Sequence, residues 1–133
     1  MLINKLPKNV ETNYFGSIKP DQASKIFYNY DLFFFPTGGE NYGHVIAESL
    51  SMGTPVLISD KTPWRNLHDD DLGWDVPLDS EESFVTIIEE LAKSSVDERV
   101  MRRNLIKDKV INRLNNQAVL DANRQLFTKH VQP

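Results

Sequence analysis

The most informative stretch of this chain runs from Phe33 to Glu48 and reads FFFPTGGENYGHVIAE. Its apolar beginning has the length and the aromatic content of a buried strand. Pro36 ends that strand, and a Thr-Gly-Gly turn follows. After Gly43, apolar residues recur at helical spacing until Gly53, a residue type that suits a helix C-terminus. The stretch therefore predicts a strand, a glycine loop and a helix, with free backbone N–H groups where the helix begins.

Two carboxylates flank the start of that helix. Glu40 lies in the loop just before it, and Glu48 lies one to two turns inside it. The free N–H groups at the helix start favour an anion such as a phosphate. Carboxylates repel a phosphate, but they accept hydrogen bonds from the vicinal hydroxyls of a sugar. An anion site between two carboxylates therefore suits a nucleotide-sugar, with the ribose on one side and the transferred sugar on the other.

This pattern resembles the E-x7-E signature of the retaining glycosyltransferases of the GT-B fold, in particular the large family 4, or group 1. The segments that match in order and spacing are Pro36-Thr37, Glu40, Gly43, Glu48–Gly53 and Pro55–Ser59. The chain departs from the family pattern at Ser49, where alanine is usual, and at His44, where the residue is usually apolar or small. Neither departure removes a side chain that the site needs.

The resemblance implies a role for each residue of the site. Glu48 would hold the ribose hydroxyls, and Glu40 would orient the transferred sugar as the catalytic residue. The amides that would stabilise the leaving diphosphate are those of Asn41, Tyr42, Gly43, His44 and Val45. The donor would be a UDP- or GDP-sugar, and no metal or other cofactor is expected. Two alternatives stay open, a covalent role for Glu40 and an acid or base role for the His44 imidazole.

The fold expected is α/β, a Rossmann-like parallel sheet with helices on both faces, and ligand at the carboxyl ends of the strands. The resemblance implies that residues 1–133 are a single domain, the C-terminal nucleotide-sugar-binding part of a GT-B enzyme. Its N-terminal acceptor domain and the start of the donor domain would be absent, so this portion alone is expected to be inactive. Further strands are expected over residues 14–18 and 55–59, and a turn with a short strand is expected within residues 68–78.

Helices are expected after Lys19, over residues 64–67 and after Ser80, then from Asp97 and, separately, from about Asn116. The residues expected to face the core from the helix that begins at Asp97 are Val100, Met101 and Leu105. Those expected to face outward from it are Arg102, Arg103, Lys107 and Lys109.

Each of three other features has two possible interpretations. Ser17 and Ile18 would contact the base, or form a simple turn. The segment Thr62–Arg65 stands in the place of a loop that reads Gly-Gly in the family and approaches the donor sugar. Trp64 and Arg65 would therefore close a sugar pocket, or else be a core residue and a surface ion pair. The segment Asp69–Asp71 would be a solvated acidic turn, or a divalent-metal site.

Composition sets the remaining limits. The chain has 133 residues, a net charge of −4 and no cysteine, which argues against a nucleic-acid-binding protein and excludes disulfides and thiolate metal sites. No apolar run reaches the length of a membrane span. A cytoplasmic location is expected. Peripheral contact at the inner face of the membrane, through the outward-facing basic residues of the helix that begins at Asp97, is an alternative. An incomplete sheet would leave a free strand edge, so a homodimer is a further hypothesis.

The function expected is hexosyl transfer with retention, to an acceptor sugar or lipid-linked glycan bound by the missing domain, in polysaccharide or glycoconjugate biosynthesis. The alternatives are a donor-binding module without activity of its own and a sugar-nucleotide epimerase with a similar fold.

Overall fold

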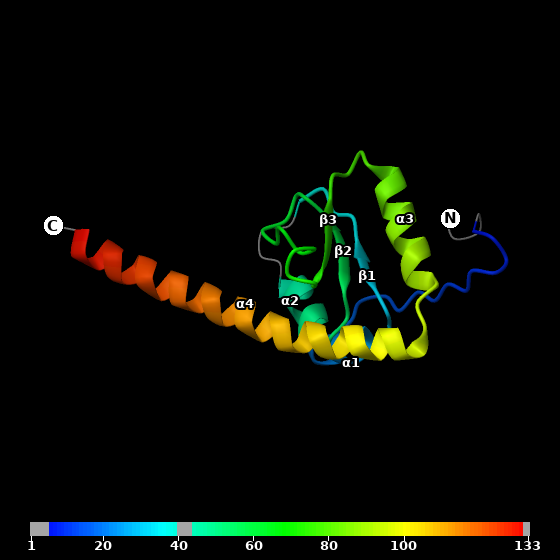
Figure 1. Cartoon of the computed structure of the whole chain (residues 1–133), viewed down its shortest axis with the longest axis horizontal. Coiled ribbons are helices and arrows are strands. Elements are labelled where there is room, and N and C mark those ends of the chain that lie inside the picture. Colours follow the sequence, from blue (N-terminus) through cyan, green and yellow to red (C-terminus); the bar gives the residue numbers. More distant parts are fainter. Residues whose placement is uncertain (1–5, 40–43, 132–133) are drawn as a thin grey trace.

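The computed structural model of the chain describes residues 6–39 and 44–131, with the side chains of the last helix described as far as residue 116. The elements are α1 (Pro20–Tyr28), β1 (Phe33–Phe35), α2 (His44–Ser51), β2 (Val56–Ser59), β3 (Gly73–Val76), α3 (Glu81–Ala92) and α4 (Val96–Val131). The strands form a parallel sheet in the order β1-β2-β3, in which Leu57 pairs with Phe34 on one side and Trp74 on the other. The expected α/β fold is confirmed (Figure 1).

Helices cover both faces of the sheet, as expected. Neighbouring residues of β2 point to opposite faces, because side chains alternate along a strand. Ile58 packs in a cluster with Leu50 of α2 and Ile106 of α4, whereas Leu57 packs with Phe84 of α3. All four strand residues of β2 are buried, which explains why this strand reads as a continuous apolar run.

Gly53 ends α2 and lets α4 come close. Its φ is +80°, and a Cβ there would lie 2.4 Å from Cγ of Arg103 and 2.7 Å from the Arg103 carbonyl oxygen. Any side chain would therefore be strained and would push α4 away. The glycine thus sets the distance between the helix that begins the candidate site and the long C-terminal helix.

Three expected elements are wrong. Residues 14–18 form no strand, because no neighbouring strand pairs with them in the described part of the chain, and Tyr14 is 83% exposed. Residues 64–67 form no helix, because Asn66 adopts a φ of +58° and the carboxylate of Asp75 binds the local amides. No separate helix begins at Asn116, since α4 continues unbroken through it, without a proline or glycine to stop it.

The expected inward face of α4 is also wrong. Val100, Met101 and Leu105 are exposed. The face that packs on the body recurs at intervals of four and three residues: Arg99, Arg103, Ile106, Val110 and Arg113. Arginines occupy this face because their stems pack along apolar surface while their guanidinium groups donate to carbonyls and carboxylates at its edges.

Candidate functional site

The candidate site lies at the carboxyl ends of β1 and β2. This is where open parallel sheets bind ligands. The loop after β1 and the loop after β2 are joined there, because the Ser59 hydroxyl donates to the Thr37 carbonyl and accepts a hydrogen bond from the Lys61 amide at 3.3 Å. Thr37 in turn donates its hydroxyl to the Gly39 carbonyl at 3.0 Å. The glycine turn that precedes α2 is therefore fixed to the end of the central strand.

The structure places only part of the predicted set. Glu40, Asn41, Tyr42 and Gly43 lie outside the described residues. His44 is the first residue of α2 and is exposed, and Val45 is partly buried against the core.

Glu48, one turn further along α2, is partly buried. Within the described ranges no side-chain hydrogen bond or ion pair occupies the Glu48 carboxylate. A partly shielded carboxylate with open acceptor positions, one turn from a helix start, suits the binding of a diol.

The departure from the family pattern at Ser49 has a structural use. Ser49 is fully buried, and its hydroxyl donates to the Thr54 carbonyl at 3.0 Å. Thr54 is also fully buried, and its hydroxyl donates to the carbonyl of Phe27 at the end of α1 at 2.5 Å. These two bonds, together with buried Ile46 and Leu50, fix α2 against the sheet. Sequence reasoning missed this role, because a serine on a helix usually faces solvent.

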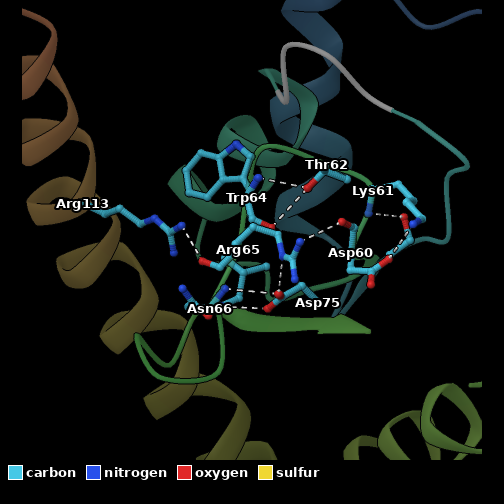
Figure 2. A network of polar contacts seen from close by, with 10 residues as sticks. Asp60, Lys61, Thr62, Trp64, Arg65, Asn66, Asp75 and Arg113 are labelled. Atoms are coloured by element: carbon cyan, nitrogen blue, oxygen red, sulfur yellow. Dashed lines mark hydrogen bonds and ion pairs between the residues drawn. The ribbon is translucent and has the colours of Figure 1, made fainter. Parts of the chain in front are cut away.

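The loop over residues 60–67 is fixed by Asp75 of β3, a residue that sequence reasoning did not single out (Figure 2). One carboxylate oxygen of Asp75 accepts from Arg65 Nε at 3.1 Å and from the Asn66 amide at 3.2 Å, and the other accepts from the Leu67 amide at 3.0 Å. Arg65 also donates to the Asp60 carbonyl at 3.1 Å. These bonds satisfy backbone groups that a non-helical turn would otherwise leave unpaired.

For Trp64 and Arg65 the structure shows the second of the two alternatives. The Trp64 ring is partly buried against the core cluster, and the Arg65 guanidinium forms an ion pair with Asp75. The Thr62 side chain fixes the backbone from Thr62 to Trp64, since its Oγ1 accepts from the Trp64 amide at 3.0 Å and donates to the Trp64 carbonyl at 3.2 Å. The two side chains therefore shape the loop through a core contact and an ion pair.

The acidic turn over Asp69–Asp71 faces α4. Lys109 donates to Asp71 at 2.6 Å, and Arg113 donates to Asp70 at 3.0 Å. The hydrogen bond and the charge of Lys109 hold the pKa of the Asp71 carboxyl below its usual value of 3.8. No group of three or more potential metal ligands gathers anywhere in the described part of the chain. The turn is therefore a set of ion pairs with α4.

A cavity is present away from the candidate site. It has a volume of about 580 Å³ and is bounded by Pro55 and Gly73, at the amino-terminal ends of β2 and β3, and by Met101 and Leu105 of α4. The predicted ligand position is at the opposite ends of these strands, away from this cavity. Over the residues described, no helix has the length and hydropathy that crossing a membrane requires.

The family model for "Glycosyl transferases group 1" matches residues 1–108 of the chain. The chain belongs to this family. The match spans all three strands and α1 to α3 and ends within α4. No curated protein and no solved structure matches the chain. As a group 1 glycosyltransferase domain it acts in the transfer of a glycosyl group from a sugar donor to an acceptor.

Proposed function

We propose that this group 1 glycosyltransferase domain binds a UDP- or GDP-sugar at the start of α2 and supports transfer of the sugar with retention. The observation that carries the proposal is the position of Glu48: a partly buried carboxylate without a partner among the described residues, on the helix that begins at the carboxyl ends of β1 and β2. Such a carboxylate can accept two hydrogen bonds from the ribose diol.

The remaining roles follow from the family pattern. Glu40 orients the transferred sugar, and the amides over residues 41–45 stabilise the diphosphate as negative charge develops on it. The departing phosphate accepts the proton of the acceptor hydroxyl, so neither a protein nucleophile nor a metal is required. The acceptor, a sugar or a lipid-linked glycan, binds to a second domain. On this account the domain alone binds donor without transferring the sugar.

The cellular setting is part of the same proposal. We place the domain in the cytoplasm, in polysaccharide or glycoconjugate biosynthesis. Contact with the inner face of the membrane through basic residues of α4, such as the partly exposed Lys107, is compatible with this setting, as is pairing of two copies along β1, an edge strand of the described sheet. An epimerase is not favoured, because the family match supports glycosyl transfer.

An amide-resolved NMR titration of this chain with UDP, GDP and ADP tests the proposal. Shifts are expected at residues 38–48 for one nucleotide. Because hydrogen bonds to a charged group contribute about 1.5–3 kcal/mol, Glu48→Ala should raise the Kd about 10- to 100-fold. Glu90→Ala, at an exposed position of α3, is the matched control and should leave the Kd unchanged. Equal affinities of the wild type and Glu48→Ala would contradict the proposal.

A further inference from the structure

Arg113 of α4 reaches the loop over residues 60–67 with three contacts. Its Nη2 donates to the Arg65 carbonyl at 2.7 Å, its Nη1 donates to Asp70 at 3.0 Å, and its Cζ lies 4.9 Å from the centre of the Trp64 ring. The side chain is 25% exposed. A planar guanidinium can donate along its edge while its face covers an aromatic ring, and no other cationic side chain does both. Figure 2 shows Arg113 reaching the loop from α4.

The loop is thus held from two directions. From β3, Asp75 binds the backbone at Asn66 and Leu67 and the side chain of Arg65. From α4, Arg113 binds the carbonyl of Arg65. Since an unpaired carbonyl at a fixed turn would have to move toward water, loss of the Arg113 bond is expected to shift the loop backbone.

The far end of this loop belongs to the candidate site. Asp60 and Lys61 follow β2 directly, and Arg65 stabilises the start of the loop by donating to the Asp60 carbonyl. The Lys61 amide binds the Ser59 hydroxyl, which binds the carbonyl of Thr37 in the turn before α2. A continuous chain of polar contacts therefore runs from α4 to the turn on which the donor site is built.

We propose that Arg113 is a positioning residue for the sugar side of the donor site. It acts through Arg65 and Trp64 and holds the loop whose first residues are joined to the turn that precedes Glu40, the residue proposed to orient the sugar. The inference rests on the proposed function, and it concerns a residue beyond the family match, which ends at residue 108. The nucleotide side of the site, at Glu48, is not joined to Arg113 by these contacts, so the two sides should respond differently.

The test compares two ligands on the same chain. UDP and UDP-glucose, or GDP and GDP-mannose if the wild type prefers GDP, are titrated against the wild type, Arg113→Gln and Lys109→Gln. Lys109 is the matched control, because it also joins α4 to the acidic turn but does not touch the loop over residues 60–67. In Arg113→Gln, loss of one hydrogen bond should raise the Kd of the nucleotide-sugar about three- to tenfold. The Kd of the free nucleotide should stay within about twofold, because the Glu48 side is unchanged.

A ligand-free measurement accompanies the titration. The Trp64 indole resonance and the amide shifts of residues 61–66 should change in Arg113→Gln and stay in place in Lys109→Gln. If the glutamine variant does not fold, Arg113→Lys, which keeps a charge for Asp70 but lacks the planar fork, should show the same selective rise in Kd.

The outcomes separate this inference from the proposed function. Equal weakening of both ligands, the same loss in Lys109→Gln, or unchanged loop resonances in Arg113→Gln would overturn the role of Arg113 and leave the donor site at Glu48 standing. If the wild type binds none of the four probes, the proposed function fails, and the role of Arg113 at the donor sugar fails with it. In that case the loop resonances still show whether α4 fixes the loop.

Discussion

Among the residues that the structure describes, α2 and α4 enclose a core cluster of eight buried residues on one face of the sheet, whereas α3 encloses a cluster of three on the other face. Polar contacts follow the same division. Three ion pairs join α4 to other segments, at Arg99, Lys109 and Arg113, while within the described residues none involves α3. The helix that carries Glu48 shares its core with α4. The face of the sheet with the larger core cluster therefore supports the site, and α3 covers the opposite face.

The largest expected effect comes from neighbouring residues of β2 that point to the two faces. Ile58 and Leu57 are both fully buried. Ile58→Ala should lower the free energy of unfolding by about 4 kcal/mol and Leu57→Ala by about 2–3 kcal/mol, because a cavity in the larger cluster loses more contacts. Urea unfolding followed by circular dichroism measures both. Equal losses would mean that the two faces contribute alike.

A smaller effect is expected from the polar contacts of α4. Arg103 donates to the Met52 carbonyl at 2.8 Å, to Thr54 Oγ1 at 3.1 Å and to the Tyr30 carbonyl at 2.9 Å. Arg103→Met keeps most of the apolar stem but leaves these acceptors unpaired, so it should destabilise the fold by about 2–3 kcal/mol.

Arg99→Met is the control for that substitution. Arg99 pairs with the exposed Asp31 at 3.3 Å, and its hydrogen bond to the Ala92 carbonyl is long at 3.4 Å, whereas Arg103 binds two carbonyls at 2.8 and 2.9 Å. Loss of Arg99 should therefore lower the free energy of unfolding by less than about 1 kcal/mol. Thermal unfolding of both variants under one set of conditions is the measurement. A loss in Arg99→Met as large as in Arg103→Met would show that charge, and not the pairing of carbonyls, holds α4.

The smallest expected effect is on the pH dependence of stability, and it again compares α4 with α3. The hydrogen bond from Lys109 lowers the pKa of Asp71 in the folded state, so the pair stabilises the fold above the unfolded pKa of about 3.8. That contribution is lost as the pH falls through the folded-state pKa. Lys109→Gln should therefore be less stable than the wild type at pH 7, and the difference should disappear in strong acid.

A matched substitution on α3 completes that comparison. Glu89→Gln alters a carboxylate on the other face that forms no ion pair in the described structure, so it should show no such pH-dependent difference. Urea unfolding of both variants across the acid range is the measurement. A stability difference for Lys109→Gln that did not change with pH would contradict the assignment to Asp71.

Much of the fold was predictable because it is encoded locally. The phenylalanine run stopped by Pro36, and the apolar spacing that ends at Gly53, each predict their element without knowledge of the rest of the chain. Pro20 at the first helical position predicted the start of α1 for the same reason. The segment at residues 14–18 failed because a strand exists only where a neighbouring strand pairs with it, and composition does not supply that partner.

The face of α4 was mispredicted for a related reason. Two stripes of that helix are apolar enough to pack, one through Val100 and one through Ile106. Periodicity alone does not choose between them. The choice was made by Gly53, which admits the backbone of Arg103 at close range, and by the carbonyls that Arg103 reaches. Arg103, which was expected to face solvent, is one of the contacts that fix the helix.

The sequence by itself determined the α/β class, the group 1 family pattern and the position of Glu48 on a helix after a glycine turn, because each depends on residues close together in the chain. The tertiary structure alone decided that Ser49 supports α2, that Trp64 and Arg65 shape a loop, and that Asp75 and Arg113 hold it from two sides. The hydrogen bonds of Asp75 and Arg113 to the loop join residues that are 8 to 48 positions apart. Their hydrogen bonds depend on the packed positions of separate elements, which local patterns do not specify.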